Sequence, residues 1–82
     1  MMYLDVLQAK EEAEYMLDDL QRQEKEISIQ VNYYPENEEL IWQLKIKQES
    51  IRIIKKRIEH AQEKLRNMAK SIVNEQTYEN ER

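Results

Sequence analysis

Residues 40–72 read LIWQLKIKQESIRIIKKRIEHAQEKLRNMAKSI, and this stretch decides the fold. Its apolar side chains follow one another at alternating spacings of four and three residues, which is the heptad repeat of a coiled-coil helix. The pattern predicts one long helix with a single narrow apolar stripe. The positions of this stripe, alternately d and a of the heptad, are Leu40, Leu44, Lys47, Ile51, Ile54, Ile58, Ala61, Leu65, Met68 and Ile72.

The first third of the chain repeats the heptad less purely. Pro35, the only proline, separates the two patterns, and glycine is absent. We therefore predict a first helix over about 3–31, a loop over 32–37, a second helix over about 38–74 and a frayed tail over 75–82. The first stripe has Tyr3, Lys10, Leu17, Glu24 and Val31 at a, and Val6, Ala13, Leu20, Ile27 and Tyr34 at d.

Two asparagines flank the expected loop. Asn32 could take the left-handed conformation that ends many helices, and Asn37 could cap the start of the second helix. Tyr33 and Tyr34 allow two interpretations. They could form an exposed recognition tip, or Tyr34 could cap the hairpin core while Tyr33 packs on the loop; we expect the second arrangement.

A short loop makes two consecutive helices antiparallel neighbours. The sequence thus predicts an all-α fold, a two-helix antiparallel coiled-coil hairpin that forms a single domain over 1–82. A chain of 82 residues leaves much of its apolar surface in water unless something covers it. We accordingly expect two hairpins to dimerise into a four-helix bundle.

The register of the hairpin can be proposed from the two stripes. If Val31 faces Leu40, the numbers of facing residues add to 71, and apolar layers align along the whole seam. The same alignment brings Glu24 opposite Lys47, two seam residues of opposite charge. A buried pair of this kind penalises wrong registers, so we predict that these two residues set the alignment. The alternative is two exposed side chains at the edge of a bundle.

Charge is divided unevenly between the helices. Residues 1–34 carry eight acidic and three basic side chains, a net charge of −5, whereas residues 45–70 carry nine basic and three acidic ones, a net charge of +6. Arg52, Lys55, Lys56 and Arg57 are candidate phosphate contacts, because basic side chains along one helix are typical of nucleic-acid binding. The alternative is a solvated face that the acidic first helix neutralises.

A second apolar stripe on the second helix lies outside the seam. Trp42, Ile46 and Ile53 form it, at spacings of four and seven residues, and Met16 widens the stripe of the first helix. Tryptophan backed by isoleucine on one helix face is typical of an interface, so we predict that these residues bind a partner. Ile72 and Val73 belong to the same set, because they are expected to project past the open end of the hairpin without an intramolecular partner.

Nothing in the sequence indicates catalysis. Cysteine is absent, histidine occurs once, and the residue three before His60 is Arg57, so the Glu-x-x-His motif of carboxylate metal sites is not formed. No metal, cofactor, small-molecule substrate or membrane span is expected. The sequence predicts a non-enzymatic cytoplasmic interaction protein, of the kind found as small bacterial or phage proteins, that forms a homodimer and binds another protein. A nucleic-acid accessory factor is the alternative.

Overall fold

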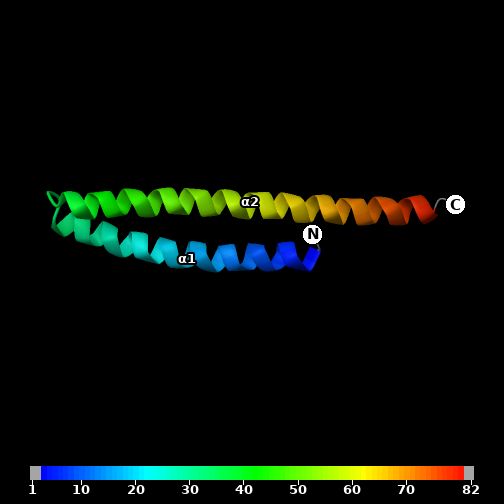
Figure 1. Ribbon diagram of the computed structural model, residues 1–82, viewed down its shortest axis with the longest axis horizontal. Helices are drawn as coiled ribbons and strands as arrows, with labels where there is room; N and C mark the ends of the chain where they lie inside the picture. The colour runs from blue at the N-terminus through cyan, green and yellow to red at the C-terminus, as the bar shows by residue number, and fades with distance from the viewer. Residues whose placement is uncertain (1–2, 81–82) are drawn as a thin grey trace.

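The structure is a computed structural model that describes the backbone of residues 3–80 and the side chains of residues 3–72. It contains two helices, α1 (Tyr3–Tyr33) and α2 (Glu38–Asn80), and residues 3–80 form no strand. The helices run antiparallel and side by side, and α2 continues well past the start of α1 (Figure 1). The predicted all-α hairpin is therefore confirmed.

The turn between the helices is held by a small set of hydrogen bonds. The Tyr34 N–H donates to the carbonyl of Gln30 at 2.9 Å and closes the last turn of α1. The side-chain oxygen of Asn37 accepts a bond of 3.2 Å from the N–H of Leu40. This bond satisfies one of the free amides at the start of α2, so the prediction of Asn37 as the N-cap is confirmed.

Two sequence predictions about the helix ends are wrong. α1 continues through Asn32 to Tyr33, and no residue in the described chain has a positive φ, so Asn32 does not end the helix in a left-handed conformation. Pro35 ends α1 instead, because it disfavours the helical conformation of the residue before it. At the other end, α2 reaches Asn80 rather than residue 74, since no glycine or proline interrupts it.

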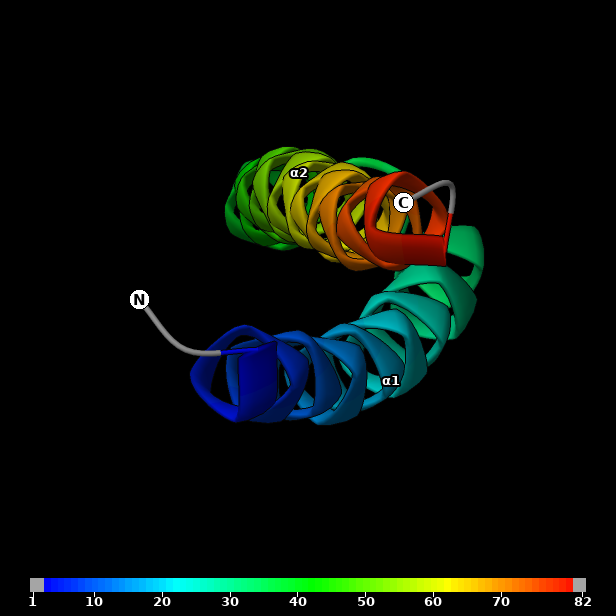
Figure 2. The ribbon, with the colours of Figure 1, turned by 90° about the vertical axis from the view of Figure 1, so that its right-hand side faces the viewer.

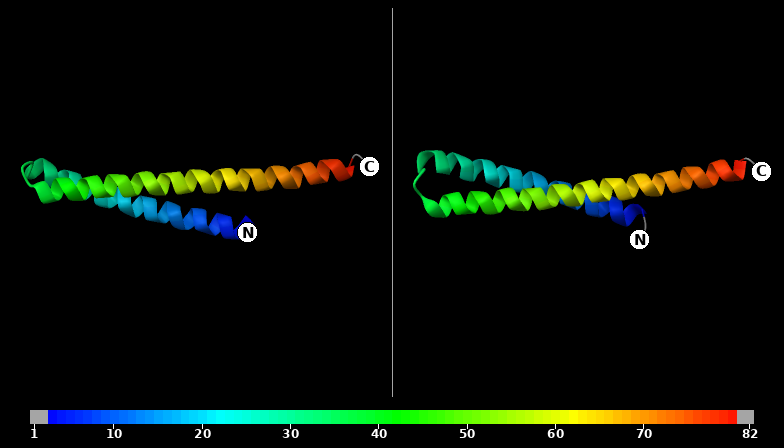
Figure 3. Two further views of the ribbon diagram at one scale, coloured as in Figure 1. Left: turned by 45° about the horizontal axis from the view of Figure 1, so that its top comes forward. Right: turned by 90° about the horizontal axis from the view of Figure 1, so that it is seen from above.

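The two helices wind about each other along their shared length. Viewed along the molecule, each helix passes from one side of the pair to the other (Figure 2), and the view from above shows α1 crossing α2 (Figure 3). Such winding keeps a heptad stripe turned toward its neighbour. The result is an elongated rod of 71 × 17 × 14 Å.

Burial follows the predicted seam. Every a and d position from Val6 to Val31 in α1, and from Leu40 to Met68 in α2, is buried or half-buried. The most deeply buried side chains are Ile51, Ile54 and Ile58, which follow one another along α2, and Val6, which lies near the start of α1. A single seam between two helices therefore produces a narrow core, and most of the molecular surface remains exposed.

The neighbours across the seam agree with the proposed alignment. Tyr3 and Met68, whose numbers add to 71, line one surface hollow together. Ala13 shares another hollow with Ile54 and Ala61, which flank its expected partner Ile58 in the seam. A slip of one heptad would move these neighbours apart by about 10 Å, at roughly 1.5 Å per residue.

This alignment predicts the outcome of a cross-linking experiment, because the chain has no cysteine of its own. A variant with Leu20→Cys and Ile51→Cys should form an intramolecular disulfide rapidly under mild oxidation. The control, Leu20→Cys with Leu44→Cys, is one heptad out of alignment and should react slowly, since disulfides need Cα atoms within about 7 Å. Faster oxidation of the control would show that the alignment is wrong.

Candidate interaction surface

Large apolar side chains are exposed on both helices. On α1 they include Tyr15 and Met16, and on α2 they include Trp42 and Ile53. Among the described side chains, the exposed large apolar residues outnumber the residues of the buried core. The complete set of exposed large apolar residues among the described side chains is Tyr3, Leu4, Tyr15, Met16, Ile29, Tyr33, Tyr34, Trp42, Ile46, Ile53 and Ile72.

The predicted second stripe of α2 lies at the surface. Trp42 is 64% exposed, Ile46 47% and Ile53 42%. Residues spaced by four and seven positions lie on one side of a helix, so the three side chains form one continuous band. Ile54, which directly follows Ile53, is only 5% exposed. The band is therefore separate from the core.

Three shallow hollows connect this band to α1. One hollow surrounds Ile53, and it shares Arg57 with a second hollow that Met16 lines from α1. The second hollow shares Ala9 and Ala61 with a third, farther toward the open end. The hollows thus lie on one side of the hairpin. We call the surface formed by these hollows and the band of α2 the apolar face. Ala9, Met16, Ile53 and Ala61 line its hollows, and Trp42 and Ile46 continue the band from Ile53 toward the turn.

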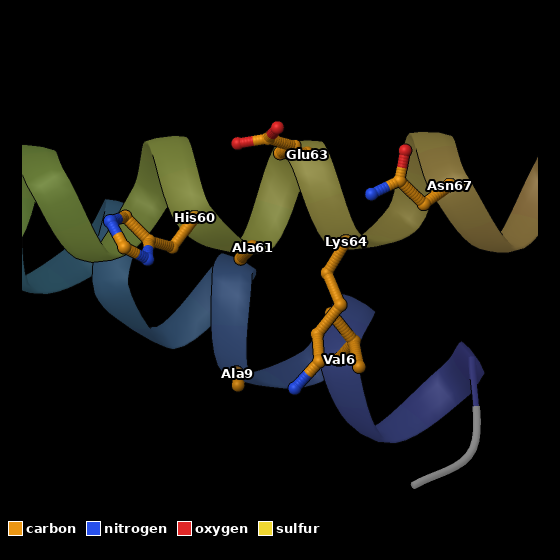
Figure 4. A pocket seen from close by; sticks show the side chains of 7 residues that line it. All are labelled: Val6, Ala9, His60, Ala61, Glu63, Lys64 and Asn67. Atoms are coloured by element: carbon orange, nitrogen blue, oxygen red, sulfur yellow. The ribbon is translucent and has the colours of Figure 1, made fainter.

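The hollows exist because small side chains occupy the interhelical boundary there. Ala9 and Ala61 carry only a methyl group each, and they leave space between the two backbones (Figure 4). Lys64 reaches from α2 toward α1 beside Val6, and its aliphatic stem covers part of this space. The apolar face is consequently indented toward its open end, where a side chain from another helix could insert.

Opposite charges lie on the two sides of the apolar face. On α1, four exposed acidic residues follow one another at intervals of seven, and Glu12 among them lines the same hollow as Met16. On α2, three basic residues surround Ile53, and Lys64 lies farther along. Acidic and basic columns therefore flank the apolar residues. The acidic column is Asp5, Glu12, Asp19 and Glu26, and the basic group is Arg52, Lys56, Arg57 and Lys64.

Ion pairs in the described part of the chain form within a helix and not between helices. Lys10 pairs with Glu14 at 3.0 Å, and Arg22 pairs with Asp18 at 2.9 Å. Arg52 donates to both oxygens of the Glu49 carboxylate.

The contact between Arg52 and Glu49 changes the ionisation of both groups. These hydrogen bonds lower the pKa of Glu49, and the same contact raises the pKa of Arg52. Both groups therefore stay charged across the physiological pH range. Arg52 is therefore neutralised within α2, and among residues 3–72 no ion pair joins α1 to α2.

The remaining predicted site residues have mixed outcomes. Glu24 and Lys47 are both half-buried in the seam, but the ion pairs among residues 3–72 do not include a bridge between them. Lys55 is exposed and does not line the hollow that Arg52, Lys56 and Arg57 share.

Two sequence predictions, one at each end of the hairpin, are wrong. Ile72 is half exposed and lines a hollow with Tyr3, so it does have an intramolecular neighbour. The side chain of Val73 lies outside the described residues. Tyr33 and Tyr34 are 78% and 64% exposed, so the expected packing of Tyr34 over the core is wrong. Tyr34 follows the last residue of α1, and the chain turns there before its ring can reach the seam.

The side of α1 away from the apolar face bears a second feature. Tyr15 is 81% exposed and lies in a hollow lined by Glu11, Glu14 and Asp18. The sequence analysis did not identify this site. Its signal was an aromatic residue at an f position among three carboxylates, but side-chain spacing alone does not separate such a site from an ordinary solvated surface.

Two kinds of site are absent from the described residues. Between residues 3 and 80 neither helix is both long and apolar enough to cross a membrane. The same part of the chain holds no cluster of three or more side chains suited to a metal ion. No protein-family model matches the sequence. Comparison with curated proteins and with solved structures gives no match either.

The separation of core and surface predicts the effect of substituting two adjacent isoleucines. Ile54→Ala should lower the free energy of unfolding by about 2 to 5 kcal/mol, because it removes a buried side chain and leaves a cavity. Ile53→Ala is the matched control and should change that free energy by less than about 0.5 kcal/mol in dilute protein. Urea denaturation followed by circular dichroism measures both. Equal losses would place Ile53 in the hairpin core.

Proposed function

We propose that this protein is a non-catalytic interaction module, whose hairpins self-associate through the apolar face into a four-helix bundle. In this form it binds another protein in an assembly or regulatory role. The observation that carries the proposal is the exposure of Trp42, Ile46 and Ile53 in one band on a hairpin whose buried core has four residues. Exposed apolar patches of this kind are characteristic of interaction sites.

Energetics support the same conclusion. Ordering a residue costs about 1 to 2 kcal/mol of backbone entropy, and burial of apolar surface is the main contribution that offsets it. A seam with four buried side chains offers little burial for a chain of 82 residues. A second helix pair that covers the apolar face would bury apolar side chains that the single hairpin leaves exposed. Association would therefore stabilise the fold.

The chemistry of the surface favours binding over catalysis. The hollows are shallow and lie between helix side chains, and the residues around Ile53 and Met16 are chiefly aliphatic stems and like-charged basic groups. His60 lines two of the hollows. No serine, threonine or cysteine lies with it in either set of lining residues, so a serine- or cysteine-type nucleophile is not paired with this histidine there.

Nucleic acid is the competing partner class for the basic group. Arg52, Lys56 and Arg57 surround an isoleucine, and Arg52 already donates to Glu49. Glu12, a member of the acidic column of α1, lines a hollow on the same face, and its carboxylate would repel phosphate. These features favour a protein partner with acidic and apolar groups over a phosphate backbone.

Self-association predicts a loss of assembly from substitutions on the apolar face. Trp42→Lys with Ile53→Lys should convert an oligomer into a monomer in sedimentation equilibrium, while the helical circular dichroism signal of the concentrated protein largely persists. Tyr15→Lys is the matched control, because it places the same charge at an exposed aromatic position on the other side of α1. This control should remain associated.

The single tryptophan gives an independent measurement of the same event. Trp42 should move from water into an apolar contact as protein concentration rises, so its fluorescence emission should shift to shorter wavelength, and the thermal midpoint should rise in parallel. A monomer with unchanged emission and midpoint at all concentrations would refute self-association. Binding of DNA or RNA that falls steeply with salt would support the nucleic-acid function instead.

A further inference from the structure

We propose that the second copy packs in one particular orientation: the two hairpins lie with their turns at the same end, and α1 of each copy lies on α2 of the other. The two-fold axis then runs along the length of the rod. This inference rests on the proposed self-association and specifies its geometry. It follows from the arrangement of charge on the apolar face.

Two symmetric arrangements can bring the apolar faces of two hairpins together. The face has α1 along one edge and α2 along the other, as the hollows shared by the two helices show. An axis along the rod places α1 opposite α2 of the second copy. An axis across the rod places α1 opposite α1, and α2 opposite α2, with the turns at opposite ends.

Electrostatics separates these two arrangements. Residues 1–34 carry a net charge of −5 and residues 45–70 a net charge of +6. On the face itself, the acidic column that contains Glu12 lies on α1, and the basic group around Ile53 lies on α2. The axis along the rod joins unlike charges over the whole length, whereas the axis across the rod joins like charges. Complementary potentials of this kind fix the orientation of an interface.

The antiparallel alignment also matches individual residues. Numbers that add to 71 lie at the same height along the rod, so Glu12 is within one turn of Arg57, with which it lines a hollow, and Met16 is within one turn of Ile53. When the two-fold axis runs along the rod, the same residue lies at the same height in both copies. The carboxylate of Glu12 then faces the guanidinium of Arg57 in the second copy, and the half-exposed Met16 covers Ile53 there.

The overhang of α2 gives a second reason for this orientation. α2 has 43 residues and α1 has 31, so α2 extends beyond the start of α1. When both turns lie at one end, both overhangs leave the bundle at the other end and can cover each other near the half-exposed Ile72. The axis across the rod would leave each overhang alone at an opposite end.

Spin labels at the turn test the orientation directly. Glu36→Cys introduces a single cysteine in the turn for attachment of a nitroxide. In the proposed dimer the distance between labels, measured by pulsed electron paramagnetic resonance, should reflect the width of two rods that are each 17 × 14 Å across. Labels separated by most of the 71 Å length would overturn the orientation while leaving self-association intact. A monomeric mass would overturn the proposed function itself.

Exchange of charges tests the contact between copies. Glu12→Lys and Arg57→Glu should each weaken self-association by about tenfold, because two like-charged contacts replace two attractive ones in each homodimer. An equimolar mixture should recover nearly the affinity of the wild type, since each heterodimer contact again joins unlike charges. Circular dichroism of each variant controls for helicity. A mixture that associates no more tightly than either variant alone would refute the pairing of α1 with α2.

Discussion

The packing of the isoleucines of α2 against α1 is the interaction on which the rest of the structure depends. Ile51, Ile54 and Ile58 follow one another at spacings of three and four, and together with Val6 they form the buried core. Their contact winds the helices about each other and fixes the side of each helix that faces water. The position of every surface feature of the molecule therefore depends on this short seam.

A hairpin with one seam cannot bury more than one side of each helix. Trp42 and Ile46 lie away from the seam, so their rings and methyl groups stay at the surface whatever the quality of the core packing. Ala9 and Ala61 create a hollow in this surface, because their short side chains leave space at the boundary between the two helices. A chain with this geometry has apolar area available for a second helix pair, and association is the simplest way to cover it.

Charge has a different role from apolar burial in this molecule. The ion pairs within the described helices are local, and a pair such as Arg22 with Asp18 contributes little to the fold because both side chains lie largely in water. The larger effect is the separation of sign between α1 and α2, which distinguishes one packing orientation from another. Apolar contact supplies the affinity of the proposed dimer, and charge selects its geometry.

The sequence by itself determined the seam, the site of the turn at Pro35 and the cap at Asn37, because heptad spacing and capping are local properties. It also identified the exposed band of Trp42. Only the tertiary structure decided which residues of α1 lie beside that band, since this depends on how two helices cross. Three features depend on that crossing: the shared hollows near Met16, the exposed Tyr34, and the absence of a bridge between Glu24 and Lys47 among the described residues. The spacing of apolar residues within one helix does not determine the distances between side chains of different helices.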